Sequence, residues 1–274
     1  MKFAFATCVQ LGKSCIEKIY EIGGSFDLLI TLKDESAKNK SGRIYLDDIA
    51  EKYNVPLLKI ENINEAPVIS KIREKQIDWL FIIGWSQIAR KELLEAPKKG
   101  CLGMHPTLLP KGRGRAAIPW AILKGLKKTG VTLFRLDEGV DTGDIAGQIE
   151  ITLAPDITAN KLYEEVTKAH VRLMEQCWKG LQQDTLSFHK QDESMATVWS
   201  GRKPEDGEIR PDMNIEEAER MVRAVTHPYP GAFYWQDGKK YILWSTKIAK
   251  EKDGFAFPLK DGWLIPIDYE IAEG

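Results

Sequence analysis

Two short stretches of the sequence carry a histidine and a carboxylate of the kind that proton transfer requires. His105 comes two positions after Gly103 and directly before Pro106, and Asp141 lies in the glycine-flanked run 138–144. Side chains two apart on a strand share a face, and proline favours extended backbone in the residue before it, so His105 is expected at a strand tip facing one site with position 103. An imidazole near a carboxylate suits general acid and base catalysis at a carbonyl. Taken alone, each residue is also an ordinary core histidine or turn carboxylate.

A cluster of positive charge follows the histidine along the chain. The whole protein has a formal net charge of -1, which argues against a chain-wide polyanion surface, so any basic site must be local. Guanidinium forks near a catalytic histidine favour phosphate binding, although a charge cluster is also a common solvated face. The cluster consists of Lys111, Arg113, Arg115, Lys124, Lys127 and Lys128.

The elements that must position these residues alternate between strand and helix. Such alternation predicts a parallel sheet covered by helices, whose ligands collect at the carboxyl ends of the strands, where Trp85 and His105 both fall. The predicted strands are 2–8, 28–31, 57–60, 79–83, 101–105 and 131–135, and the predicted helices are 11–22, 46–53, 66–75, 88–95 and 159–180.

The pattern changes after the last of these helices. A polar stretch, 182–194, predicts a linker, and beyond it we expect a helix at 215–224 and strands at 232–235, 241–247 and 263–267. The predicted fold class is therefore α/β, with a Rossmann-like, mostly parallel sheet domain over 1–190 and a smaller, mostly-β, OB-like domain over 191–274.

Composition narrows the class of protein further. The four cysteines show no disulfide framework or paired spacing, so reduced core thiols are expected, and histidine and cysteine are too scattered for a zinc site. We therefore expect no metal. Because no apolar stretch reaches the length of a membrane span and no signal segment precedes the first strand, we also expect a cytoplasmic protein.

The ordered motifs resemble the formyltransferase family that uses 10-formyltetrahydrofolate. Its hallmark is Asn-x-His-x-Ser/Thr-Leu-Leu-Pro, then a basic glycine turn and Asp-x-Gly, and the matching text here is 103–110, 113–114 and 140–145. The segments 221–225 and 228–233 resemble the C-terminal domain of two-domain members. The resemblance implies formyl transfer with 10-formyltetrahydrofolate as co-substrate, and a possible homodimer.

By this resemblance, His105 is the general base and later the acid, and Asp141 orients and supports it. The family's asparagine, which hydrogen-bonds the developing oxyanion, falls at position 103, where this chain has Gly103. We expect a substitute: protonated His105, a water molecule, Ser86 or Gln87. The resemblance further implies that folate binds along Trp85, Ser86, Gln87, Ile88, Leu136, Asp137, Gly139 and Val140.

The acceptor is expected to be the amine of a nucleotide-linked amino sugar. The runs 111–120 and 222–233 resemble formyltransferases of that kind, with Lys111, Arg113 and Arg115 near the diphosphate. Tyr229 is expected to contribute to nucleotide binding. Together with Phe233 and Trp235 it offers a base-stacking surface, or equally core packing.

Three alternatives stay open. Methionyl-tRNA formyltransferase runs the same reaction on charged tRNA, but the segment 182–200 holds Lys190 as its only lysine or arginine before Ser200, whereas nucleic acid normally demands a broad basic footprint. Formyltetrahydrofolate hydrolase is disfavoured because no regulatory domain is expected before Met1. A catalytically degenerate folate-binding protein is suggested by Gly103 alone.

Overall fold

The computed structural model describes residues 1–36 and 42–272, which form two compact units. The chain passes between them more than once. Unit 1 comprises Met1–Arg113, Gly130–Glu150 and Val166–Val198, and unit 2 comprises Gly114–Thr129, Ile151–Glu165 and Trp199–Gly274. The predicted division at residue 190 stays a prediction about the domains.

A seven-stranded sheet forms the centre of unit 1, in the order β3-β2-β1-β4-β5-β7-β8. The first five of these strands run parallel, whereas β7 runs antiparallel to β5 and pairs Thr132 with His105. The mostly parallel sheet predicted from the alternating pattern is thus confirmed. The strands are β1 (Phe3–Ala6), β2 (Leu28–Leu32), β3 (Leu57–Ile60), β4 (Trp79–Ile82), β5 (Gly100–His105), β7 (Lys128–Arg135) and β8 (Ile145–Thr152).

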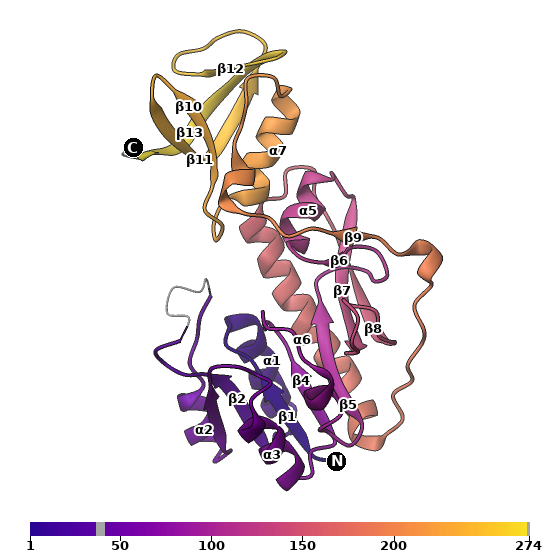
Figure 1. Ribbon diagram of the computed structural model, residues 1–274. Helices are drawn as coiled ribbons and strands as arrows, with labels where there is room; N and C mark the ends of the chain where they lie inside the picture. Colours follow the sequence, from indigo (N-terminus) through magenta and orange to yellow (C-terminus); the bar gives the residue numbers. More distant parts are fainter. Residues whose placement is uncertain (37–41, 273–274) are drawn as a thin grey trace. The chain divides into compact units, whose positions relative to one another are not determined.

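Apolar periodicity explains which elements form around this sheet. Strand β1 is buried at all four positions, as a strand covered on both faces must be, and the buried residues of α1 include Leu11, Ile16 and Ile19, which share one helical face. Figure 1 shows α1, α2 and α3 alongside the strands of this sheet. The helices of the first half are α1 (Gln10–Glu21), α2 (Asp47–Lys52), α3 (Ala66–Glu74), α4 (Lys91–Leu94) and α5 (Ala117–Leu123), and the long α6 follows at Ala159–Gln183.

Unit 2 contains a four-stranded antiparallel sheet, in the order β10-β11-β13-β12, with a helix packed against it. That helix, α7 (Ile215–Val225), starts with a capping box in which Asn214 and Glu217 bond reciprocally to backbone amides. Figure 1 shows α7 beside these strands. The smaller, mostly-β region predicted for the C-terminal part is confirmed. Its strands are β10 (Ala232–Gln236), β11 (Lys239–Ala249), β12 (Phe257–Leu259) and β13 (Gly262–Ala272).

Short elements complete the described chain. Two-residue strands β6 (Arg113–Gly114) and β9 (Val198–Trp199) pair with each other, and two 3₁₀ turns lie at Glu193–Met195 (η1) and Pro204–Gly207 (η2).

The structure corrects one element and adds others. A helix was expected over 88–95, but only α4 is helical, because Arg90 is extended and the side chain of Asn64 donates at 2.9 Å to the Ile88 carbonyl oxygen, which a helix would use itself. Asn64 also accepts from the Arg90 amide at 2.7 Å. The elements α5, β8 and β12 were not predicted. In β8 the sequence does alternate, since Ile149 and Ile151 are buried between exposed polar residues. This alternation is short and follows Gly147, so it was overlooked.

All four cysteines lie within the described ranges, where they are buried and none takes part in a disulfide, so their state as reduced thiols stays a prediction. Burial raises the pKa of Cys15 to about 12 and that of Cys177 to about 11. These thiols are therefore protonated and unreactive near neutral pH.

Candidate active site

His105 ends β5, and its two ring nitrogens face different partners. Nε2 lies 2.8 Å from the carbonyl oxygen of Gly112, and Nδ1 lies 3.6 Å from Oδ2 of Asp141. A carbonyl oxygen only accepts, so Nε2 carries the proton of the neutral ring and donates it to Gly112. The unprotonated Nδ1 therefore lies near a carboxylate that would stabilise a positive charge on the ring. The imidazole is 10% exposed, which limits competition from bulk water.

Asp141 lies on a loop in which backbone conformation and close contacts restrict the residue types that fit. Its own φ is +55°, in the left-handed region that aspartate tolerates better than most side chains. At Gly143 a Cβ atom would lie 1.7 Å from the carbonyl oxygen of Arg135, so only glycine fits there. The Asp137 carboxylate accepts a hydrogen bond from the Gly139 amide at 3.0 Å and tightens the same loop. The glycine-flanked aspartate motif thus has a packing reason beside any chemical one.

Three side chains, which we call the clamp, join the loop of Asp141 to the basic turn. Arg113 is 5% exposed and donates to both carboxylate oxygens of Glu193, at 2.8 and 2.6 Å, and to Oε1 of Gln191, at 3.1 and 2.8 Å. Nε2 of Gln191 in turn donates to the carbonyl oxygens of Asp141 and Gly143, both at 2.8 Å. The hydrogen bonds to Glu193 raise the pKa of Arg113, and Arg113 lowers the pKa of Glu193. The clamp consists of Arg113, Gln191 and Glu193.

Sequence reasoning missed two members of the clamp. Gln191 and Glu193 lie in the stretch predicted as a linker, and they contact residues 48 to 80 positions away. No local periodicity or motif spacing signals contacts over such separations. The stretch is therefore part of unit 1 and supports its site, besides connecting two regions of the chain.

Gly103 faces a crowded, apolar neighbourhood. A Cβ atom at this position would lie 2.6 Å from Cδ2 of Leu136 and 3.5 Å from the ring of Phe134. Leu136 thus occupies the space into which a side chain at position 103 would project. An asparagine there requires Leu136 to move, and a water molecule would find carbon atoms rather than the two or more polar partners it needs.

The segment 85–88 is already engaged in its own contacts. The amide of Gln87 accepts from Trp85 Nε1 at 3.1 Å and from the Ile63 amide at 2.9 Å, and it donates to the Glu61 carbonyl oxygen at 2.7 Å. Gln87 is therefore held by its surroundings, which weakens it as the substitute for the missing asparagine. Trp85 and Leu136 both pack against the same cluster of core residues.

Comparisons with known proteins decide the family. A family model described as "Formyl transferase" matches residues 22–177, and one described as "Formyl transferase, C-terminal domain" matches residues 202–263. The chain belongs to the formyltransferase family. Its members transfer formyl groups from formyltetrahydrofolate, so this chain is a group-transferring enzyme.

The relatives of this formyltransferase differ in the acceptor that their names or bound ligands indicate. Methionyl-tRNA formyltransferase of Agathobacter rectalis is 30% identical over 257 residues, which are 93% of this chain and 83% of that one. The solved methionyl-tRNA formyltransferase from Clostridium thermocellum is 25% identical with a TM-score of 0.67 and full coverage of both chains. An N-formyltransferase from Helicobacter canadensis, solved with folinic acid and dTDP-3-aminofucose, is 18% identical with a TM-score of 0.70, covering 98% of this chain and 100% of that one. The last likeness shows the fold alone.

The other predicted binding residues of the formyltransferase lie in different settings. Lys111 and Arg115 are exposed, as is Ile88 with 80% of its surface, and Val140 is 60% exposed. Tyr229 lines a cavity of about 140 Å³ within unit 2, together with Pro119, Arg202 and Pro230, and burial raises its pKa. Phe233 is 7% exposed whereas Trp235 is 49% exposed. The binding roles of these residues stay predictions.

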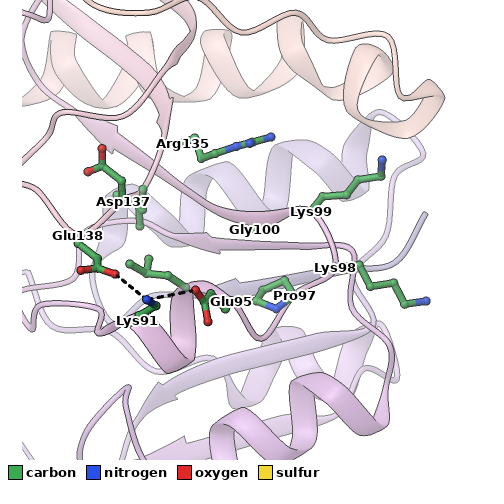
Figure 2. A pocket seen from close by; sticks show the side chains of 11 residues that line it. Lys91, Glu95, Pro97, Lys98, Lys99, Gly100, Arg135, Asp137 and Glu138 are labelled. Atoms are coloured by element: carbon green, nitrogen blue, oxygen red, sulfur yellow. Dashed lines mark ion pairs between the residues drawn. The ribbon is translucent and has the colours of Figure 1, made fainter.

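A pocket of about 460 Å³ in unit 1 includes Leu136 and Asp137 of the predicted folate segment (Figure 2). Lys91 lies 3.8 Å from Glu138 and 4.0 Å from Glu95 there, and Figure 2 shows both ion pairs. Arg135 is packed over the rings of Trp79 and Phe188, at 5.3 and 4.9 Å. The lining thus mixes charges of both signs.

The described residues offer neither a metal site nor a membrane-spanning helix. Within residues 1–36 and 42–272, no three His, Cys, Asp or Glu side chains gather in a way that could hold a metal ion. Nor is any helix in that part of the chain long and apolar enough to cross a membrane.

Proposed function

We propose that this formyltransferase moves the formyl group of 10-formyltetrahydrofolate to the amine of a nucleotide-linked amino sugar. The observation that supports the transfer step, whichever amine is the acceptor, is the geometry at His105, whose Nε2 is bonded to Gly112 while Nδ1 faces Asp141 at 3.6 Å. A neutral imidazole held in this way has one nitrogen ready to take a proton and a carboxylate beside it to stabilise the resulting charge.

The residues present fit a folate co-substrate. Trp85 and Leu136 come from the two segments predicted to bind it and pack on one core cluster, so the segments form part of one apolar wall in unit 1. Both segments are irregular backbone, which leaves peptide groups to recognise the polar edge of a pterin ring. The co-substrate supplies an activated formyl carbon when it is bound.

His105 is the base and the acid of the proposed transfer. As the acceptor nitrogen forms its bond to the formyl carbon, Nδ1 of His105 takes the proton that this nitrogen loses. When the bond from the carbon to N10 of the folate breaks, His105 returns the proton to N10, and the ring is again neutral. Asp141 stabilises the imidazolium between these events. The products are a formamide and tetrahydrofolate.

The choice of an amino-sugar nucleotide as acceptor is supported by the positions of the exposed basic side chains. Lys111 and Arg115 are exposed and four positions apart in the turn after the catalytic strand, which suits a compact diphosphate. The stretch after α6 offers a nucleic acid little positive charge, since Lys190 is accompanied by Asp184, Asp192 and Glu193. Both observations favour a small anionic acceptor.

Methionyl-tRNA is the second candidate acceptor. It is favoured by the names of sequence relatives, one of them 33% identical over 220 residues. Both acceptors present a primary amine, so the chemistry at His105 is the same for either. The difference lies in the size and charge of what carries the amine.

Separate reactions with each acceptor test the proposal. The enzyme is incubated with donor carrying a ¹³C-labelled formyl group and with UDP-, dTDP- or GDP-linked amino sugars, or with charged methionyl-tRNA, and products are identified by mass spectrometry. We expect a nucleotide sugar to gain one labelled formyl group, and His105→Ala to abolish the gain. Labelling of methionyl-tRNA alone would reassign the acceptor. Donor binding without transfer to any acceptor would mean a degenerate, folate-binding protein.

A further inference from the structure

The clamp links the partners of both ring nitrogens of His105. Gly112, which accepts from Nε2, directly precedes Arg113 in the chain, and Arg113 is bonded through Gln191 to the backbone of Asp141, which faces Nδ1. The contacts therefore form a closed circuit around the imidazole. A shift at any member changes the distance between the imidazole and the carboxylate.

A second attachment ties the basic turn to the same stretch of chain. The Gly112 amide donates to Oγ1 of Thr197 at 2.8 Å, and the Arg113 amide donates to the Thr197 carbonyl oxygen at 2.9 Å. Residues 191–197 thus hold the turn by its backbone as well as by the guanidinium. These two bonds restrain the backbone of Gly112, whose carbonyl oxygen accepts from Nε2 of His105.

Arg113 has most of its donors committed within the protein. Nε, Nη1 and Nη2 all donate to Gln191 or Glu193, and the side chain is 5% exposed. A phosphate would have to displace Glu193, a carboxylate already bound in a forked geometry. Lys111 and Arg115 face no such competition in the contacts described, and both are exposed.

Gln191 is suited to its place by having both a donor and an acceptor end. Its carbonyl oxygen receives the guanidinium while its NH₂ group donates to two backbone carbonyl oxygens. A carboxylate in its place keeps the first set of bonds and loses the second. Glutamate at 191 would therefore release the Asp141 loop while leaving Arg113 bound.

We propose that the clamp is a positioning device that fixes Asp141 relative to His105, and that Arg113 is one of its positioning residues rather than a phosphate ligand. The inference rests on the proposed role of His105 and Asp141 in formyl transfer. Gln191 and Glu193, which lie in the stretch predicted as a linker, thereby help to position the groups of the active site.

Gln191→Glu tests the clamp through kinetics, with Gln182→Glu on the exposed surface of α6 as its matched control. We expect kcat to fall by about a hundredfold for Gln191→Glu, because misplacement of a catalytic pair by about 1 Å has such effects, with KM for either substrate within about threefold. Gln182→Glu should behave as the wild type. In an Asp141→Asn background, Gln191→Glu should add little, since it acts through Asp141. Full additivity would overturn the assignment.

Arg113→Lys separates positioning from phosphate binding. An ammonium group keeps the charge but loses the fork, so a positioning role predicts a lower kcat with little change in KM for the acceptor. A phosphate ligand would show the reverse, a raised acceptor KM with kcat retained. That pattern in Arg113→Lys would contradict the proposal. Arg115→Lys, at an exposed position proposed to bind phosphate, is expected to show this reverse pattern and provides the comparison.

An NMR measurement tests the clamp without any acceptor. The Nε2 proton of His105, donated to Gly112, should give a slowly exchanging, downfield ring signal that is absent in His105→Ala. We expect Arg113→Ala or Gln191→Glu to broaden or shift it, with thermal unfolding confirming that each variant is folded. An unchanged signal with unchanged kcat would overturn the clamp. A wild type that shows the signal but transfers to no acceptor would sink the proposed function and leave the clamp standing.

Discussion

The two units bury different kinds of side chain. The buried imidazole and guanidinium groups among the described residues, His105, Arg113 and His170, all lie in unit 1. The sheet of unit 2 is instead filled by aromatic contacts, such as Tyr241 with Phe257 at 5.1 Å between ring centroids. Buried polar groups are costly unless they are paired, and here His105 and Arg113 belong to the candidate active site while His170 couples electrostatically to His105. Substitutions of these buried groups in unit 1 should therefore alter activity or the pH dependence of folding, whereas substitutions in the four-stranded sheet and α7 of unit 2 should alter stability alone.

The largest effect should come from His105→Ala, which removes the proposed acid and base. General acid and base catalysis typically contributes about 10² to 10⁴-fold, so kcat should fall by that factor while the donor still binds. Steady-state formyl transfer and equilibrium binding of the donor measure the two quantities. A variant that retains more than about a tenth of wild-type kcat would show that proton transfer at His105 does not limit the reaction.

A pH effect on folding is expected from His170, in unit 1. Burial above all, with a contribution from the charge of His105, lowers the pKa of His170 from 6.5 to about 4, although its hydrogen bond to Val166 acts in the opposite direction. Below pH 6.5 the unfolded chain binds a proton here that the folded chain does not. The free energy of unfolding should therefore fall as the pH drops from 6.5 toward 4, by about 3 kcal/mol in total.

Denaturant unfolding at several pH values measures this effect. His170→Gln removes the titration and keeps a side-chain donor, so its free energy of unfolding should depend less on pH than that of the wild type. His189→Gln, at an exposed position, is the matched control and should follow the wild type. Equal slopes for all three proteins would contradict the prediction.

Gly103→Asn tests whether Leu136 leaves room for a side chain at position 103. Since Leu136 fills the space beyond position 103, the added side chain should overpack the site and lower the free energy of unfolding by about 1–3 kcal/mol, without any gain in kcat. The double variant Gly103→Asn, Leu136→Ala makes room and should recover stability. Thermal unfolding and kcat are measured for both. A rise in kcat for Gly103→Asn alone would mean that Leu136 yields easily and that only an oxyanion donor was missing.

The smallest effect is expected from Asn214→Ala, which removes the cap of α7 in unit 2. Loss of a capping side chain typically costs about 1 kcal/mol. The midpoint of denaturant unfolding should shift accordingly, and kcat at temperatures where the variant is folded should stay at the wild-type value. A changed kcat would break the contrast between the units.

The sequence predicted the parts of the fold that repeat a local pattern. The buried strand near residues 79–83 and the strand ending at His105 were visible as apolar runs, and the motif around Asp141 was visible as an ordered match to a family. The helix over 88–95 was overestimated, because the bonds of Asn64 to the backbone of residues 88 and 90 arise from a distant loop. The clamp escaped prediction for the same reason, since Gln191 and Arg113 are 78 residues apart.

The same limit applies to the space around Gly103. The sequence showed that the family's asparagine is replaced, and it suggested a water molecule or Gln87 as substitutes. Only the fold reveals that Leu136 lies against this position and that Gln87 is held by Glu61, Ile63 and Trp85. Side-chain volume and hydrogen-bond saturation depend on neighbours that are remote in sequence.

A competition reaction tests the acceptor and the role of the His105 and Asp141 pair together. Wild-type enzyme and Asp141→Asn are each given labelled 10-formyltetrahydrofolate with equal concentrations of a nucleotide-linked amino sugar and charged methionyl-tRNA. We expect the label on the amino sugar with both proteins, at a rate far lower for Asp141→Asn. Label on methionyl-tRNA, at rates equal for the two proteins, would contradict both the acceptor and the role of the His105 and Asp141 pair.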